Sequence, residues 1–261
     1  MTAPTKVLAF DFGASSGRAI LATYQNGQLS YREIHRFENR PREKGGHLCW
    51  DFSALLSEVR KGIEQAGSFN SVGFDTWGVD FGLLDSSGRL LTQPVHYRDT
   101  RTNGILDHAL QIMDAQTLYA KTGTQILSIN TLFQLLAFKN QHPDLLKQAK
   151  TLLFMPDLFA YMLSGKPVCE RSIASTSQMM DLKTGAWNAD ILETFGLPKG
   201  LLLPTVKSGT QTGTLENGAK ILAVAGHDTQ CAVAAIPSQD ENAAFLSCGT
   251  WSLLGTELDA P

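Results

Sequence analysis

The chain contains 261 residues, of which 43% are hydrophobic and 18% are charged, a balance typical of a globular protein with a real core. Its formal net charge of −3 and the lack of any Lys/Arg-rich segment argue against a nucleic-acid partner. No apolar run approaches the roughly 20 residues that cross a bilayer, so we expect no membrane partner.

The beginning of the chain predicts three consecutive strands. Residues 6–12 form an apolar run typical of a buried strand, residues 17–24 follow as a second, and residues 29–37 alternate as a half-exposed strand does. Residues 25–27, Gln-Asn-Gly, are a turn signal. We therefore expect an antiparallel meander, whereas a dinucleotide-binding fold would pass from its first strand into a helix.

The middle of the chain combines helical patterns with two further strands. Residues 53–66 space their apolar residues as a helix does, with Ser53 as a candidate N-cap. Residues 71–85 predict a strand, a break at Trp77–Gly78 and a second strand. Three more helices are predicted, the last of which stops at a glycine suited to a helix end: 101–113, 130–141, and 151–164 before Gly165.

The last part of the chain repeats the design of the first. Residues 220–229 predict a strand, residues 230–236 the start of a helix, and residues 237–242 a linker. Residues 243–255 are apolar, turn through Cys248–Gly249–Thr250 and become apolar again, as the beginning of the chain does. Two such strand–turn–strand units suggest two domains of similar design.

The cysteines and the first residues predict a cytoplasmic protein. The opening MTAPTK leads straight into a strand-like run and contains no apolar signal-peptide core. The cysteines are widely spaced and match no zinc or redox motif, which favours reduced thiols; they are Cys49, Cys169, Cys231 and Cys248.

The turn after the first strand has the composition of a phosphate-binding loop. Gly13 and Gly17 would permit positive φ and a close approach of the backbone to a ligand. Ser15 and Ser16 add hydroxyls and backbone N–H groups that could bind an anion. The alternative is a plain hairpin, which this short pattern by itself slightly favours.

Two charged side chains flank this turn. Asp11 ends the first strand and could hold Mg²⁺ through water, because hard cations prefer oxygen ligands. Arg18 begins the second strand and could pair with phosphate. In the hairpin alternative, Asp11 caps the turn and Arg18 faces water.

Two carboxylates, Asp75 and Asp80, flank Trp77 and Gly78 between two apolar segments. Polar groups at strand ends often line a cleft. A tryptophan beside carboxylates suits a sugar, which has apolar faces and hydroxyl edges. An equally good alternative is a core tryptophan with aspartates that stabilise a turn.

Two later polar segments fit helix starts. Asp99, in the segment 96–102, is expected to cap a helix while the neighbouring arginines stay solvated. Asp228, in Gly-His-Asp-Thr at 226–229, lies where an apolar strand meets a helix, and it could be a general base facing a substrate hydroxyl. The positive end of the helix dipole would keep it ionised. The alternative is again a helix cap, which this segment taken alone favours.

The chain resembles the FGGY carbohydrate kinases from residue 6 to about residue 256. The resemblance rests on five segments in their order and spacing: FDFGASSGR, DTWGVDF, YRDTRTNG, GHDT and LSCGTWSLLG. Within the family, the second and fourth segments together with GTWSL point to the kinases of L-rhamnulose. D-x-G alone marks only the wider actin/hexokinase/Hsp70 ATPase fold.

The resemblance implies an α/β, ribonuclease-H-like fold of the actin/hexokinase/Hsp70 ATPase type, with a mixed five-stranded sheet flanked by helices. Residues 1–238 would form an N-terminal sugar-binding domain, and residues 239–261 would begin a C-terminal ATP-binding domain of similar design. Family members are much longer than this chain. We therefore expect the chain to be the N-terminal part of a kinase and to be inactive by itself.

The resemblance also assigns the residues of a site between the two domains. Asp11 would assist the Mg²⁺. The ATP phosphates would be bound by a loop and one further residue: Ala14, Ser15, Ser16, Gly17 and Arg18, with Thr250. The sugar would be bound by the backbone of Gly78 and by the triplet His227, Asp228 and Thr229, with Asp228 as the proton acceptor.

The implied reaction is the phosphorylation of the 1-hydroxyl of L-rhamnulose, with ATP and Mg²⁺. A related ketose such as L-fuculose or L-xylulose is an alternative substrate. A non-catalytic actin-like module that binds a sugar or a protein is an alternative function. The sequence does not indicate an oligomeric state.

Overall fold

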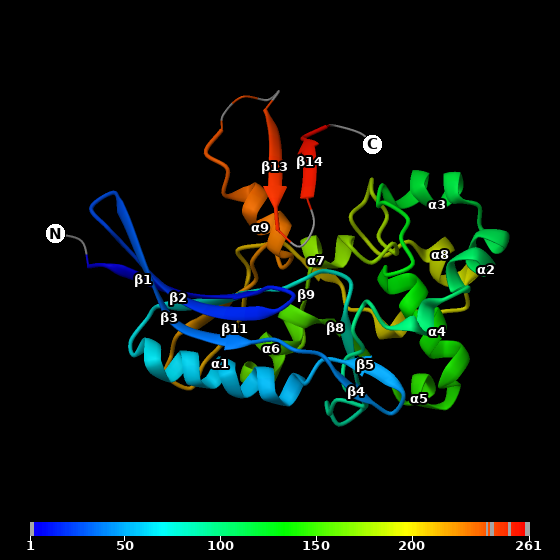
Figure 1. The fold of residues 1–261 in the computed structure, drawn as a ribbon, viewed down its shortest axis with the longest axis horizontal. Coiled ribbons are helices and arrows are strands. Elements are labelled where there is room, and N and C mark those ends of the chain that lie inside the picture. Colours follow the sequence, from blue (N-terminus) through cyan, green and yellow to red (C-terminus); the bar gives the residue numbers. More distant parts are fainter. Residues whose placement is uncertain (1–2, 239, 241–242, 250–251, 259–261) are drawn as a thin grey trace.

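The main sheet of the molecule is mixed and has six strands, in the order β11–β12–β6–β1–β2–β3 (Figure 1). The structure, a computed structural model, describes residues 3–238, 240, 243–249 and 252–258. β6 runs parallel to β1 and to β12, and the other neighbours are antiparallel. The strands are β1 (Thr5–Phe12), β2 (Ser16–Gln25), β3 (Gln28–Glu38), β6 (Ser71–Asp75), β11 (Gln211–Thr214) and β12 (Lys220–Leu222).

The predicted meander is confirmed, because β1, β2 and β3 are neighbours and antiparallel. The predicted mixed sheet is also confirmed, but it has six strands instead of five. At its far edge β11 pairs with β12, and the sequence of β11, Gln-Thr-Gly-Thr, carries little of the β-branched and aromatic signal that marks a strand.

The two faces of the sheet differ, and the alternation along β1 shows how. Leu8, Phe10 and Phe12 are fully buried on one face, because successive side chains of a strand point to opposite sides. This face is covered by α1 (Phe52–Ala66) and α6 (Met155–Ser164), from which Phe159 stacks on Phe12 with ring centroids 4.5 Å apart. Asp11, which lies between Phe10 and Phe12 in the sequence, points to the opposite and more open face of the sheet.

A second group of elements lies beyond one end of the sheet and has its own apolar core (Figure 1). Leu118, Leu132 and Phe133 are fully buried within it. Its helices are α2 (Ile105–Ile112), α3 (Ala115–Thr122), α4 (Thr131–Gln141), α5 (Pro143–Gln148) and α8 (Ala189–Thr194). Short two-stranded pairs lie outside the main sheet. They include β4 (Arg42–Lys44) with β5 (His47–Cys49), β7 (Phe81–Leu84) with β8 (Thr151–Phe154), and β9 (Cys169–Glu170) with β10 (Thr205–Val206). The remaining short helices are η1 (Thr100–Thr102), α7 (Arg171–Ser175) and η2 (Lys199–Leu201).

Three of the helix starts predicted before residue 165 are wrong. The helix predicted over 101–113 is η1 followed by α2 from Ile105, with the left-handed Gly104 between them. The N-cap of α1 is Asp51 and not Ser53, since the Asp51 carboxylate accepts a hydrogen bond from the backbone N–H of Ala54 at 3.1 Å. Residues 151–154 form β8 instead of the first turn of a helix, because this apolar run pairs antiparallel with β7. The predicted end at Gly165 is confirmed, with φ +70°.

The last described segments form a helix and a separate hairpin. α9 (Asp228–Ala234) follows β12 after a short loop. β13 (Ala244–Cys248) and β14 (Ser252–Thr256) pair antiparallel with each other, and the hairpin stands away from the main sheet with β13 against α9 (Figure 1). The predicted strand–turn–strand is thus confirmed, while Thr250 in its turn lies outside the described residues.

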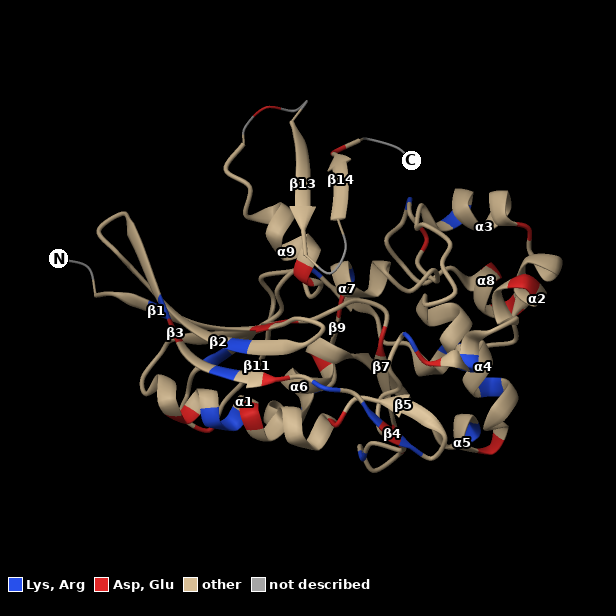
Figure 2. Cartoon of the chain, viewed as in Figure 1, with Lys and Arg blue, Asp and Glu red and all other residues tan. Residues whose placement is uncertain are grey.

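Acidic and basic residues are interleaved along α1 and over the helical group (Figure 2). Within the described part of the chain, no helix has both the length and the apolar composition that a membrane span requires.

Candidate active site

Three aspartates meet at the carboxyl end of β1 and β6. Asp11 and Asp75 are partners in the parallel register of these strands. Asp228 is brought to them by the backbone: the N–H of Thr76 donates to the carbonyl of Gly226 at 3.0 Å, and the N–H of Asp228 donates to the carbonyl of Thr76 at 2.8 Å. The loop before α9 therefore extends the sheet at the edge where ligands of open α/β sheets bind.

The negative charges of Asp11 and Asp228 both act on Asp75. Burial raises the pKa of Asp75 well above its ordinary value, and the negative charges of Asp11 and Asp228 raise it further. The positive charge of Arg18 acts in the opposite direction. The raised pKa favours the protonated, neutral form of Asp75 beside its charged neighbours.

Asp11 and Arg18 face each other across the β1–β2 turn and form an ion pair. Both side chains stay partly exposed, at 29% for Asp11 and 41% for Arg18. The turn is therefore a hairpin, as one interpretation of the sequence held, and it also presents a carboxylate and a guanidinium at the ligand edge of the sheet.

The reason for the two glycines of this turn differs from the predicted one. Neither Gly13 nor Gly17 has a positive φ. A Cβ added at Gly17 would lie 2.2 Å from Cζ of Phe37, so an aromatic ring of the same chain fills the space. Gly13 donates its N–H to the carbonyl of Ser16 at 2.9 Å and accepts from the side-chain amide of Asn39 at 2.8 Å. Phe37 in β3 and Asn39 directly after it thus hold the turn in place.

Between these anchors, the turn residues Ala14 and Ser15 are accessible, with Ser15 exposed. The carbonyl of Ser15 accepts the backbone N–H of Asn39 at 3.0 Å. Within the described residues, no cluster of three or more His, Cys, Asp or Glu side chains is arranged to bind a metal ion. A Mg²⁺ beside Asp11 fits this geometry only with water and phosphate as its other ligands, which is how Mg²⁺ is usually bound.

The start of α9 places His227, Asp228 and Thr229 together. Gly226 before them has φ +66°, and a Cβ added there would lie 2.7 Å from Cβ of Ile173, so both conformation and space require glycine. The N–H of Thr229 lies 2.6 Å from Oδ1 of Asp228 and 3.1 Å from Nδ1 of His227. His227 is thus the N-cap of α9, with Nδ1 accepting from the N–H of Thr229, so the helix cap that the sequence favoured at Asp228 is its neighbour. Nδ1 of His227 also lies 3.0 Å from Oδ1 of Asp228.

Asp228 has the protonation state that a base needs. Burial favours its neutral form, but the hydrogen bond and charge of His227 and the donors of Thr229 outweigh burial, so the pKa of Asp228 lies below its ordinary value. Its side chain is 40% exposed. An ionised, accessible carboxylate at this edge can accept a proton from a bound hydroxyl.

Gly78 lies directly against this triplet. A Cβ added at Gly78 would lie 2.4 Å from Cδ2 of the His227 ring. The structure thus brings Gly78, His227, Asp228 and Thr229 together, and it places them at the same edge as Asp11. Thr250 is outside the described residues, so its relation to them is not part of the geometry.

The tryptophan and the second aspartate of the 74–80 segment belong to the core. Asp80 accepts hydrogen bonds at Oδ2 from Nε1 of Trp50 and Trp77, at 2.6 and 2.9 Å, and from the N–H of Tyr97 at 3.1 Å. Its Oδ1 accepts from Nε2 of Gln134 at 2.9 Å. Burial raises the pKa of Asp80 to about 6 against these donors. The core alternative is right for Trp77 and Asp80.

The segment 96–102 contributes one residue that the sequence did not single out. Asp99 accepts the N–H of Arg101 at 3.0 Å and so caps η1, as predicted. Arg101 is buried instead of solvated, at 9% exposure. Tyr97 lies close enough to Asp228 for that charge to raise its pKa, after burial and against the charge of Arg98. The long-range hydrogen bond from the N–H of Tyr97 to Asp80, not a local pattern, ties Tyr97 to the segment that contains Gly78.

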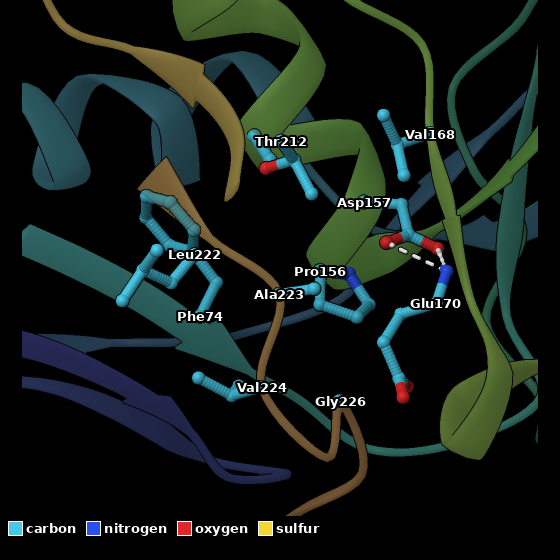
Figure 3. Close-up of a pocket in the computed structure, with 11 residues that line it drawn as sticks. Phe74, Pro156, Asp157, Val168, Glu170, Thr212, Leu222, Ala223, Val224 and Gly226 are labelled. Atoms are coloured by element: carbon cyan, nitrogen blue, oxygen red, sulfur yellow. Dashed lines mark hydrogen bonds between the residues drawn. The ribbon is translucent and has the colours of Figure 1, made fainter. Parts of the chain in front are cut away.

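A small pocket behind Gly226 contains two further acidic residues (Figure 3). The N–H of Glu170 donates to the carboxylate of Asp157 at 3.1 Å, and burial raises the pKa of Asp157 well above its ordinary value. The Glu170 carboxylate accepts from the N–H of Ile173 at 3.0 Å and from Oγ of Ser208 at 2.8 Å. Donors of the chain itself satisfy this pair, so it supports α7 and the Gly226 loop.

Comparison with known proteins agrees with this site. Residues 6–246 match the N-terminal domain of the FGGY family of carbohydrate kinases. The chain is 43% identical over 266 residues to a rhamnulokinase of Bacteroides thetaiotaomicron, covering 97% of this chain and 55% of that protein. It is 42% identical over 265 residues to a rhamnulokinase of Yersinia pestis, covering 98% of this chain and 55% of that protein.

Solved structures show the fold. A ligand-bound xylulose kinase from Lactobacillus acidophilus superposes with a TM-score of 0.85 at 20% identity, covering 98% of this chain and 55% of that one. A gluconate kinase from the same organism gives a TM-score of 0.85 at 20% identity, covering 99% and 55%. The predicted sugar-kinase fold is confirmed, and the chain spans about half the length of the curated relatives it matches. With a family match over most of its length, the chain belongs to the FGGY family of carbohydrate kinases.

Proposed function

We propose that the protein containing this chain transfers the γ-phosphoryl group of ATP to the 1-hydroxyl of L-rhamnulose. The observation that carries the proposal is Asp228, an accessible carboxylate with a lowered pKa, beside Gly78 and at the same sheet edge as the Asp11–Arg18 pair. The choice of sugar rests on the relatives named rhamnulokinase.

The sugar would lie between Gly78 and the start of α9. His227, Asp228 and Thr229 would contact its hydroxyls, and the backbone of Gly78 would form part of the wall. Asp228 would orient the 1-hydroxyl and accept its proton late in the transfer. An ordinary carboxylate is basic enough for that role, because the alcohol becomes acidic only as its bond to phosphorus forms.

The β1–β2 turn would hold the phosphates of ATP. The backbone of residues 14–17 would contact phosphate oxygens, and Arg18 would neutralise charge on them. Asp11 would hold Mg²⁺ through water, and the ion would supply charge stabilisation to a transition state spread over the phosphate oxygens. Thr250 would contact the nucleotide. Positioning and charge stabilisation would account for most of the rate.

The domain assignment belongs to the same proposal. Residues 1–238 would form the sugar-binding domain, and residues 239–261 the beginning of the ATP-binding domain. Both substrates would then meet between two domains whose closure excludes water from the reacting phosphate. A small-molecule sugar kinase with reduced cysteines would work in the cytoplasm.

A kinase assay on the complete gene product tests the proposal. ADP release would be coupled through pyruvate kinase and phosphoenolpyruvate to lactate dehydrogenase, and measured across L-rhamnulose, L-fuculose and L-xylulose with ATP and Mg²⁺. We expect the highest kcat/KM with L-rhamnulose and a product phosphorylated at carbon 1 by ³¹P and ¹³C NMR. A higher kcat/KM for another ketose would identify that ketose as the substrate instead. No ADP release with any ketose would favour a non-catalytic binding module.

A further inference from the structure

Val79, the residue after Gly78, has a backbone conformation that its side chain disfavours. Its φ is +65°, in the left-handed region. A β-branched residue is an outlier there, and such a conformation persists only where the surrounding structure imposes it. Asn26 and Gln178 are the other non-glycine residues with positive φ in the described ranges. Asn26 lies in a tight turn that asparagine tolerates, whereas Val79 lies in the interior at 8% exposure.

Two threonine hydroxyls hold the backbone of Val79 from both sides. Its N–H donates to Oγ1 of Thr176 at 3.1 Å, and its carbonyl accepts from Oγ1 of Thr131 at 2.7 Å and, at the longer distance of 3.4 Å, from Nε2 of Gln134. Thr131 is fully buried. The two hydroxyls come from segments 52 and 97 residues away along the chain, so the conformation of Val79 is imposed by tertiary structure.

The hydroxyl of Thr176 has a fixed orientation. It follows α7 and donates to the carbonyl of Ile173 at 2.7 Å, so its hydrogen is occupied and a lone pair faces the N–H of Val79. Its methyl group is also close to the candidate sugar wall, because a Cβ added at Gly78 would lie 3.2 Å from Cγ2 of Thr176. Thr176 therefore touches both residues of the strained turn.

Thr131 is held by an equally rigid support. It is the first residue of α4. Its neighbour Asn130 donates from Nδ2 to Oε1 of Gln178 at 2.6 Å, and Gln178 is itself left-handed and fully buried. The support of Val79 thus reaches into the second apolar core.

We propose that Thr176 and Thr131 are positioning residues that impose the left-handed conformation of Val79 and so press Gly78 against the ring of His227. This rests on the proposed function. The sugar then meets a preformed wall whose distance to Asp228 is fixed before binding. The hydroxyls touch neither substrate nor nucleotide; they act through the Gly78–Val79 backbone. Such preorganisation is how a site holds reacting groups within the narrow range that transfer requires.

The first test is steady-state kinetics of the complete gene product. Thr176→Val and Thr131→Val keep the shape and remove one hydroxyl each. We expect each to raise the KM for L-rhamnulose about fivefold, the equivalent of one buried hydrogen bond, while the KM for ATP is unchanged. Thr176→Ser, which keeps the hydroxyl, should restore the wild-type KM. The matched control is Thr117→Val, since the hydroxyl of Thr117 donates to Oδ2 of Asp114 at 2.7 Å at the exposed start of α3 and not to the backbone of Val79.

The second test is a double-mutant cycle with Val79→Gly, because glycine adopts the left-handed region freely. If the hydroxyls serve to impose this conformation, Thr176→Val should have a smaller effect on both the ketose KM and the urea midpoint when residue 79 is glycine. Equal effects in both backgrounds would overturn the inference, as would an unchanged ketose KM in both threonine-to-valine variants. A wild-type protein without ketose kinase activity would overturn the proposed function, and the urea midpoints of the cycle would still decide whether the hydroxyls impose the turn.

Discussion

The imidazole of His227 occupies the space that any side chain at residue 78 would need. A Cβ added at Gly78 would lie 2.4 Å from Cδ2 and 2.9 Å from Nε2 of that ring. Gly78 has no positive φ, so its lack of a side chain is required by this contact and not by its conformation. His227 therefore contacts both Gly78 of the candidate sugar wall and Asp228, the candidate base.

Gly78→Ala should disturb sugar binding through this link. The added methyl group would displace the His227 ring, and overpacking of this kind costs about 1–3 kcal/mol. We expect the KM for the ketose to rise roughly tenfold, with little change in the KM for ATP. The control is Gly200→Ala, because Gly200 has no atom within 4 Å of an added Cβ. An unchanged ketose KM together with a lower melting temperature would mean that Gly78 serves packing alone.

Asp228→Asn should abolish turnover and spare sugar binding. The amide keeps the shape and accepts the N–H of Thr229, but it cannot accept the substrate proton. Loss of a general base typically lowers kcat by ~10²–10⁴. Calorimetry with L-rhamnulose should give a dissociation constant close to that of the wild type. The exposed Asp144→Asn is the matched control. A kcat within a few-fold of the wild type would mean that Asp228 only supports the first turn of α9.

Local sequence patterns predicted the strands, turns and helix ends that depend on neighbouring residues alone. The β1–β2–β3 meander follows from apolar alternation and the turn at 25–27, and the end of α6 follows from Gly165. The strand predicted over 220–229 ends at Leu222, and α9 begins at Asp228, before the helix start predicted over 230–236. The N-cap Asp51 was missed because Ser53 is an equally good cap in sequence, and the fold decides between them.

The assembly of the candidate site could not be predicted from local patterns. Asp228 lies at the sheet edge that carries Asp11 only because the backbone of Thr76 pairs with that of Gly226, which is a long-range contact. A valine in an apolar segment indicates a strand, so the left-handed Val79 is invisible until Thr131 and Thr176 are placed around it. The resemblance to a family supplied the site residues that patterns alone left open.

The pH dependence of stability should depend on His96. Burial, assisted by the charge of Arg98, lowers the pKa of His96 to about 4, below the value of about 6.5 in an unfolded chain. Between pH 6.5 and pH 4 the unfolded state therefore binds more protons than the folded state does. The contribution of the neutral His96 to the free energy of unfolding is present above pH 6.5 and is lost as pH falls towards 4. Between pH 7 and pH 5 the loss is on the order of 1–2 kcal/mol.

Urea unfolding of the wild type and His96→Gln at pH 7 and pH 5 checks this expectation. Asp80 acts in the opposite direction, because its pKa is raised to about 6 and it takes up a proton in the folded state as pH falls. Comparison of the two proteins cancels that contribution. The wild type should lose more stability than His96→Gln, and the exposed His108→Gln should behave as the wild type does. Equal losses in the wild type and His96→Gln would show that His96 does not titrate in this range.

A polypeptide of residues 1–261 alone should bind the ketose weakly and transfer no phosphate. Gly78, His227 and Asp228 all lie in the described part of this chain, so part of the candidate sugar wall is present. Transfer also requires the γ-phosphate in line with the hydroxyl, about 3–3.5 Å away, and effective molarity is lost when that geometry is not held. The chain spans 55% of its curated relatives, and the nucleotide in a two-domain kinase needs both walls of the cleft.

Two measurements on this polypeptide decide the matter. Calorimetry should detect L-rhamnulose binding that Gly78→Ala weakens and Gly200→Ala leaves unchanged, with little binding of ATP. A coupled assay should detect no sugar phosphate above background. Leu246 and Leu254 on the hairpin are 62% and 78% exposed, so the protein must be kept dilute enough to avoid association through them. Sustained turnover would mean that residues 1–261 contain a complete transfer site, and the two-domain account of the cleft would be wrong.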